Sequence, residues 1–171
     1  MKRSGLLILL MLLTSCGAYV NYDFEKNTDF SEYKTYNYFT DMNTGFSQLD
    51  NKRIMAAIDN KLKSLGFEKS ENPSFNIDIQ SAEVTNTSNS NVGVGIGGTG
   101  RNVGGGVSIG IPVGASRTTR EISFEFVDDS KSGVFWQAIT KISYIGNTPE
   151  KREANFAKLI EKVFSKYPPQ K

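Results

Sequence analysis

The first sixteen residues constrain this chain most, because they decide the compartment in which the rest must fold. Two basic residues, Lys2 and Arg3, precede an unbroken apolar run over residues 6–13, and Cys16 follows two small polar residues. This order is typical of a secretory signal peptide. The run is too short for a bilayer-spanning helix, which needs about 20 apolar residues. We therefore expect an exported protein.

Cys16 is the only cysteine of the chain. The stretch Leu13-Thr14-Ser15-Cys16 resembles the lipobox of bacterial lipoproteins, with a large apolar residue three places before the cysteine and a small residue just before it. The resemblance implies cleavage after Ser15 and lipid on the Cys16 sulfur, so the membrane is an expected partner. The alternative is an ordinary cleaved signal with a stray cysteine.

Cleavage at this point divides the chain into a signal peptide, residues 1–15, and a mature part, residues 16–171, whose length suits one domain with its own core. Gly17 and Ala18 place no acidic residue after the cysteine, so the retention signal known from some inner-membrane lipoproteins is missing. We expect the outer membrane, on its periplasmic face.

Charge and composition argue against several classes of protein. The net charge of +2 comes from Lys2 and Arg3 alone, because without these two the 20 basic residues fall to 18, equal to the 18 acidic ones. No basic patch with interleaved aromatics indicates nucleic acid. The chain has no histidine, which removes the commonest general base and most zinc sites. We therefore expect no enzyme, no cofactor and no metal.

The sequence matches three short functional motifs, but the residues around each match do not fit the site that the motif requires. Residues 95–100 satisfy G-x-G-x-x-G, but more glycines follow where a dinucleotide site needs a helix, so no nucleotide is expected. Residues 106–110 satisfy G-x-S-x-G, but a nucleophile elbow needs a strand-to-helix turn and a histidine. Residues 128–133 imitate the start of a calcium loop, but Ile139 stands where a bidentate glutamate is required.

Hydrophobic periodicity predicts both helices and strands. Ser47 and Asp50 have the spacing of a capping box, an apolar face follows, and Gly66 suits the end of this helix. Thr148 as N-cap and Pro149 at the first helical position begin a second helix. Alternation of apolar and polar side chains predicts strands over residues 18–24, 30–39, 75–84, 120–126 and 134–140.

Residues 92–115 form a glycine-rich segment in which Val and Ile alternate with Gly, Ser and Pro. The alternation predicts the two strands of a hairpin, with β-branched side chains on one face and almost nothing on the other. Pro112 places its strand at an edge or an end. The hairpin either covers the sheet or contacts an envelope protein partner or a membrane.

A second set of residues suggests a different function. Tyr33, Tyr36, Tyr38 and Trp136 could stack on a sugar, although a two-residue period favours core positions. Four aspartates could form a carboxylate pair in space, which is the group that glycoside hydrolysis uses. These are Asp23, Asp29, Asp128 and Asp129.

The order of features resembles a family of bacterial envelope lipoproteins, the domain of unknown function 4136. The residues that carry the resemblance are Tyr22-Asp23-Phe24, the stretch from Asp29 to Tyr36, the helix end from Leu62 to Phe67, and the turn and strand from Asp128 to Trp136. The resemblance implies an α+β fold and an envelope location. It implies no activity and no site residue beyond the lipidated Cys16.

The fold expected is therefore a single α+β domain of two layers, with a mostly antiparallel sheet of five or six strands, two helices on one face and the Gly-rich hairpin at 92–115. The function expected is that of a lipid-anchored envelope protein with a non-catalytic binding or structural role. The alternative is a carboxylate-dependent hydrolase or a carbohydrate-binding protein of the periplasm.

Overall fold

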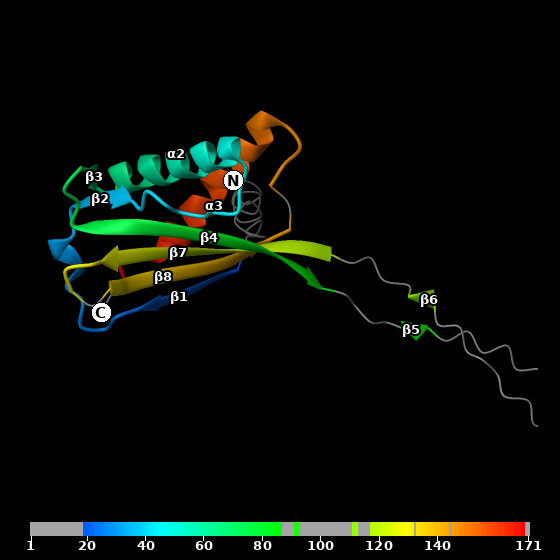
Figure 1. Cartoon of the computed structure of the whole chain (residues 1–171), viewed down its shortest axis with the longest axis horizontal. Helices are drawn as coiled ribbons and strands as arrows, with labels where there is room; N and C mark the ends of the chain where they lie inside the picture. The colour runs from blue at the N-terminus through cyan, green and yellow to red at the C-terminus, as the bar shows by residue number, and fades with distance from the viewer. Residues whose placement is uncertain are drawn as a thin grey trace, which may run out of the picture.

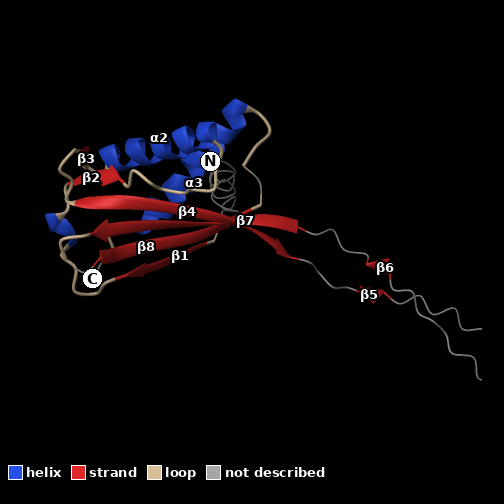
Figure 2. Ribbon diagram, viewed as in Figure 1, coloured by secondary structure: helices blue, strands red, loops and turns tan. Residues whose placement is uncertain are grey.

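Six strands form one mixed sheet, and two long helices lie side by side on one of its faces (Figure 1 and Figure 2). This arrangement confirms the predicted α+β class with a mostly antiparallel sheet. Cys16 and the predicted signal peptide lie outside the described residues, as does most of the segment 92–115. The computed structural model describes residues 19–86, 91–92, 111–112, 117–131, 133–143 and 145–169.

The strand order across the sheet is β1-β8-β7-β4-β2-β3. The pairs β1–β8, β8–β7 and β7–β4 are antiparallel, whereas β2 runs parallel to both β4 and β3. Neither the parallel pairing nor the short β3 is predicted by the periodicity. The strands are β1 (Val20–Phe24), β2 (Thr35–Tyr38), β3 (Glu68–Lys69), β4 (Phe75–Asn86), β7 (Arg117–Asp128) and β8 (Gly133–Ile142).

Strands β4 and β7 form the centre of the sheet, and buried side chains alternate with less buried ones over residues 75–79 and 122–128. One face of the pair is apolar and buried under the helices, and the other is mainly polar, as at Asp78 and Ser123. The inward positions are Phe75, Ile77 and Ile79 on β4 and Ile122, Phe124 and Phe126 on β7.

A bulge interrupts the pairing of β7 with β8. Phe126 lies opposite Trp136 and Val127 lies opposite Val134, so Phe135 is the extra residue. Both Phe135 and Trp136 are buried, although they are consecutive along the strand. The bulge therefore adds a second aromatic ring to the core where strict alternation would have placed one outside.

Both helices begin at the residues that the capping pattern predicts. Ser47 caps α2 (Gln48–Ser64) and Thr148 caps α3 (Pro149–Val163), each accepting a backbone N–H with its hydroxyl. A short 3₁₀ turn, η3 (Phe164–Lys166), continues α3. The helices bury Ile54, Ile58, Leu62, Phe156, Leu159, Ile160, Val163 and Phe164 against the sheet.

The predicted strand over residues 30–39 is too long. Residues Phe30–Glu32 form a 3₁₀ turn, η2, and only Thr35–Tyr38 pair as β2. The reason is local, because the Asp29 carboxylate accepts hydrogen bonds from Ser31 N at 3.0 Å and from Ser31 Oγ at 2.7 Å. Such a side-chain cap competes with the extended backbone.

At one end of the sheet, β4 and β7 extend past their neighbours (Figure 1). The last pair between β7 and β8 is Arg120 with Ile142, but β4 and β7 stay paired as far as Asn86 with Arg117. We call this two-stranded extension, Val84–Asn86 with Arg117–Thr119, the arm. Beyond it, β5 (Asn91–Val92) pairs antiparallel with β6 (Ile111–Pro112), as a hairpin in this segment requires.

Candidate functional site

The predicted lipidation residue lies close to the folded domain along the chain. Cys16 itself is outside the described residues, which begin at Tyr19. Strand β1 begins at Val20, only four residues after Cys16. The side chain of Tyr19 is exposed, and its carbonyl accepts a hydrogen bond of 2.9 Å from Thr140 Oγ1 on β8. The chain is therefore already tied to the sheet just after the predicted anchor.

The four aromatic residues considered for sugar stacking all lie in the core. Tyr33 stacks on Phe135 with ring centroids 4.1 Å apart, and Trp136 is only 1% exposed. The Tyr36 and Tyr38 hydroxyls donate to the same Asp59 oxygen at 2.9 and 2.7 Å. None of these rings offers an open face to a ligand.

The buried environment keeps the hydroxyl groups of the three tyrosines among these residues protonated. Burial is the main cause that raises the pKa of Tyr36 and of Tyr38, and the hydrogen bonds to the Asp59 carboxylate raise both further. Burial, together with the bond from its hydroxyl to Asp128 Oδ2, raises the pKa of Tyr33 to about 12. These tyrosines act as hydrogen-bond donors that hold the sheet to the helix and turn beside it.

The four aspartates do not converge on one hollow. Asp23 lies on β1, where its carboxylate accepts the Phe24 N–H at 2.9 Å, and Asp29 caps η2. Asp128 and Asp129 lie at the turn after β7 and line a hollow of about 390 Å³, whereas Asp23 lines a different one with Glu25, of about 450 Å³. The structure therefore separates Asp23 from Asp128 and Asp129, which line one hollow together.

Asp128 has a structural task at its turn. Its carboxylate accepts hydrogen bonds from Ser130 N at 2.9 Å, from Ser130 Oγ at 2.6 Å and from the Tyr33 hydroxyl at 3.0 Å. Burial alone would raise the pKa of Asp128, but these bonds and the charge of Lys131 outweigh it and lower the pKa. The result is a closed turn, not a calcium loop.

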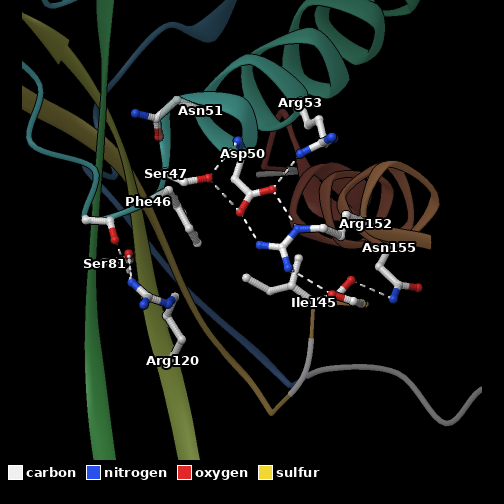
Figure 3. Close-up of polar contacts among 12 residues, drawn as sticks. Phe46, Ser47, Asp50, Asn51, Arg53, Ser81, Arg120, Ile145, Arg152 and Asn155 are labelled. Atoms are coloured by element: carbon white, nitrogen blue, oxygen red, sulfur yellow. Dashed lines mark hydrogen bonds and ion pairs between the residues drawn. The ribbon is translucent and has the colours of Figure 1, made fainter. Parts of the chain in front are cut away.

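An ion pair with a buried carboxylate joins the first turns of the two helices (Figure 3). Asp50 of α2 is 2% exposed and accepts Arg152 Nε of α3 at 2.9 Å, with a second bond from Arg152 Nη2. Arg53 Nη1 at 3.0 Å and the Ser47 hydroxyl at 3.1 Å complete the set around the carboxylate. The bonds from Arg152, then those from Arg53 and Ser47, hold the pKa of Asp50 below its ordinary value.

Arg120 forms a second cluster at the same end of the sheet (Figure 3). Its Nη1 donates to the Gly45 carbonyl and to Ser81 Oγ, both at 2.9 Å, and its Nη2 pairs with Glu83 at 2.5 Å. The guanidinium also lies 5.1 Å from the Phe46 ring centroid. These contacts fasten the loop before α2 to the base of the arm.

Sequence reasoning identified Asp50 only as a capping residue and missed Arg120 and Arg152. The capping-box spacing was the one available signal, and it reports contacts within four residues. Asp50 and Arg152 are 102 positions apart in the chain. Only the packing of α2 beside α3 brings them together.

A further hollow, of about 560 Å³, lies beside the edge strand β1. Tyr22, Phe24 and Trp136 line it on the sheet side, and Ser165–Pro169 lines it on the other. The Trp136 Nε1 and Tyr167 hydroxyl have no hydrogen-bond partner among the described residues and are buried. Because both atoms are covered, neither is available to a ligand in this hollow.

Neither a metal centre nor a membrane-spanning helix is present in the part of the chain that the structure describes. No group of three or more His, Cys, Asp or Glu side chains is arranged to hold a metal ion among those residues. Within the same residues, no helix is both long and apolar enough to cross a membrane.

A family model described as domain of unknown function (DUF4136) matches residues 20–169. The chain belongs to this family. The match covers the complete sheet and both helices, so the DUF4136 domain and the described fold coincide. No curated protein matches the chain.

Two solved structures are similar to this chain, both at low sequence identity. A PDZ domain protein from Parabacteroides distasonis is 14% identical with a TM-score of 0.56, over 90% of this chain and 37% of that one. The DUF4136 chain thus spans little more than a third of that protein's length. The PelC dodecamer from Paraburkholderia phytofirmans is 11% identical over 87% of this chain and 96% of that chain, with a TM-score of 0.47.

Proposed function

We propose that this DUF4136 protein is a lipid-anchored component of the bacterial envelope, held by acyl chains on Cys16 at the periplasmic face of the outer membrane. Its folded domain binds or supports other envelope components and catalyses no reaction. The observation that carries the proposal is the short distance along the chain between the lipobox cysteine and the edge strand β1, which begins at Val20.

The anchor would hold the domain directly at the membrane surface. Four residues of fully extended chain span at most about 14 Å, so the start of β1 stays that close to an acylated Cys16. Two or three acyl chains, at about 0.8 kcal/mol per buried CH₂, make such attachment effectively permanent. A domain that is tethered so tightly suits contacts within the envelope better than the capture of a freely diffusing substrate.

Two features of the domain support a non-catalytic role. The rings of Tyr33, Tyr36, Tyr38 and Trp136 are used in the core, and Asp23 lines a different hollow from Asp128 and Asp129. The proposal of a non-catalytic role would be wrong if the protein hydrolysed a glycan and lost that activity when one of these aspartates was replaced by asparagine.

The second part of the proposal concerns the Gly-rich hairpin at 92–115, which we propose as the contact to another envelope component. The arm that leads to it extends beyond the sheet, and its two strands have no further strand beside them among the described residues. Such a ribbon exposes backbone donors and acceptors that a partner can satisfy.

Replacing Cys16 tests the anchor directly. The variant Cys16→Ser should remain as uncleaved precursor and take up no radiolabelled palmitate, because serine offers no thiol to acylate. The matched control is Ser15→Gly, which keeps a small residue before the cysteine and should be processed and labelled like the parent. Processing and labelling of Cys16→Ser would overturn the proposal.

A further inference from the structure

We infer that the end of the sheet that carries the arm lies against the lipid headgroups, so that the membrane surface is itself the partner of the arm. The inference rests on the proposed lipid anchor. The anchor alone requires neither this orientation of the domain nor a contact between the arm and lipid headgroups.

The strand register places the start of β1 and the arm at the same end of the sheet. Val20 lies opposite Thr140, Thr140 lies opposite Ile122, and Ile122 lies opposite Ser81, so these four residues form one row across β1, β8, β7 and β4. The arm begins at Val84, three residues beyond that row on β4. An acyl group close to Val20 therefore holds the base of the arm close to the bilayer.

The starts of both helices lie at this end as well. Arg152, in the first turn of α3, binds Asp50 in the first turn of α2 and donates from Nη1 to the Gly146 carbonyl at 2.8 Å. Gly146 follows shortly after the end of β8 at Ile142. The surface that faces the bilayer in this orientation thus includes residue Leu49 beside Asp50.

Two exposed apolar side chains lie on this surface. Tyr19, just before β1, is 77% exposed, and Leu49 at the start of α2 is 62% exposed. A tyrosine suits the headgroup region because its ring is apolar and its hydroxyl is polar. Leu49 lies in the first turn of α2, and contact of this helix start with the bilayer would remove its side chain from water.

The charge of the intervening chain suits an anionic surface. Between Glu83 and Glu121 the sequence contains no acidic residue, and its only charged residues are Arg101, Arg117 and Arg120. Arg120 already pairs with Glu83. The stretch between Glu83 and Glu121 therefore carries only positive charge, and anionic lipids attract basic residues.

Backbone chemistry limits how deep the arm goes. Within the described residues, β8 ends beside Arg120 and β2 ends beside Ile77, so both outer edges of the arm lack a paired strand. Unpaired N–H and C=O groups are costly in hydrocarbon, where no water can satisfy them. The headgroup layer, which is wet and polar, is therefore the depth that fits the arm.

Two residues at opposite ends of α2 provide the test. Acylation occupies the only native thiol, so Leu49→Cys and Leu65→Cys each create one reactive thiol on an exposed helix end, at parent exposures of 62% and 37%. Each full-length, acylated variant is labelled with a small fluorophore and reconstituted into phosphatidylglycerol-containing vesicles, with and without a spin-labelled lipid quencher. Thr118→Cys, labelled and reconstituted in the same way, reports whether the arm lies close to the lipid.

The inference predicts severalfold stronger lipid quenching at residues 49 and 118 than at residue 65. Equal quenching at 49 and 65, or none at 49 in protein that floats with the vesicles, would overturn the orientation while leaving the anchor intact. Protein that fails to float at all would overturn the anchor and the orientation together. A residue-118 label that is unquenched by lipid but shielded from a soluble quencher in native envelopes would assign the arm to a protein partner instead.

Discussion

Asp50 and Arg152 join the first turns of α2 and α3 through an ion pair whose carboxylate is almost completely buried. The pair sets how the two helices lie beside each other, at the end of the sheet from which the arm extends. The stability of this ion pair therefore affects the geometry of the surface that the proposed envelope contact would use.

Removing one partner of this pair should destabilise the domain strongly. Asp50→Ala removes the buried carboxylate to which Arg152 and Arg53 donate, and should lower the free energy of unfolding by about 3 kcal/mol. The matched control is Glu161→Ala, which breaks the Lys61–Glu161 pair between the same helices, where Glu161 is 66% exposed. That change should lower the free energy of unfolding by no more than about 1 kcal/mol, as measured by urea unfolding of both variants. Equal losses of unfolding free energy for the two variants would contradict the greater importance of the buried Asp50–Arg152 pair.

The same carboxylate predicts a dependence of stability on pH. Because the folded protein holds the pKa of Asp50 below its ordinary value of 3.8, the contribution of Asp50 is complete above that value and is lost as the pH falls through the lower folded pKa. Urea unfolding should be measured from about pH 7 to about pH 2.5. The free energies of unfolding of the wild type and of Asp50→Asn should converge below about pH 4. Parallel curves would show that Asp50 does not titrate differently in the folded state.

Substitutions at two glycines with positive φ distinguish the cost of backbone strain from the cost of a steric clash. Gly66 ends α2 at φ +87°, and a Cβ there would have no other atom within 4 Å, so Gly66→Ala should lower the unfolding free energy by about 1 kcal/mol from backbone strain alone. Gly45 has φ +68°, and a Cβ there would lie 2.5 Å from the Ser81 carbonyl oxygen. Gly45→Ala should therefore be clearly the more destabilising in thermal unfolding. The reverse order would mean that the loop before α2 can move away from β4.

Two tyrosine-to-phenylalanine changes should have opposite effects. Tyr167→Phe removes a buried hydroxyl that has no partner among the described residues, and should leave stability unchanged or raise it by about 1 kcal/mol. Tyr38→Phe removes the donor to Asp59 and should lower stability by about 1 kcal/mol. Chemical denaturation of the two variants beside the wild type measures both. A loss for Tyr167→Phe would reveal a partner for its hydroxyl.

Trp136 gives an optical test of the carbohydrate-binding alternative. It is the only tryptophan and is 1% exposed, so its emission should be blue-shifted and weakly quenched by acrylamide until the domain unfolds. Titration with cell-wall oligosaccharides should leave that emission unchanged, because no ring face is open to stack on a sugar. A saturable change that Trp136→Phe abolishes would favour the sugar-binding protein over the proposed role.

The sequence predicted best those elements whose signals are local. The starts of both helices follow from Ser47 and Thr148, because a cap acts within one turn. Strands β4, β7 and β8 follow from alternation. The prediction was wrong over residues 30–32, where the Asp29 side chain competes with the strand, and it missed the bulge at Phe135, because a bulge depends on the strand opposite.

By itself, the sequence determined the class of fold, the positions of the helices and central strands, and the lipobox at Cys16, all of which are patterns within a few neighbouring residues. Only the tertiary structure decided that β2 runs parallel to β4, that Asp50 meets Arg152, and that Val20 and the arm lie at one end of the sheet. Each of these relationships joins residues far apart in the chain. They arise because burying the apolar faces of the helices and strands against one another selects a single arrangement, and no local pattern encodes that choice.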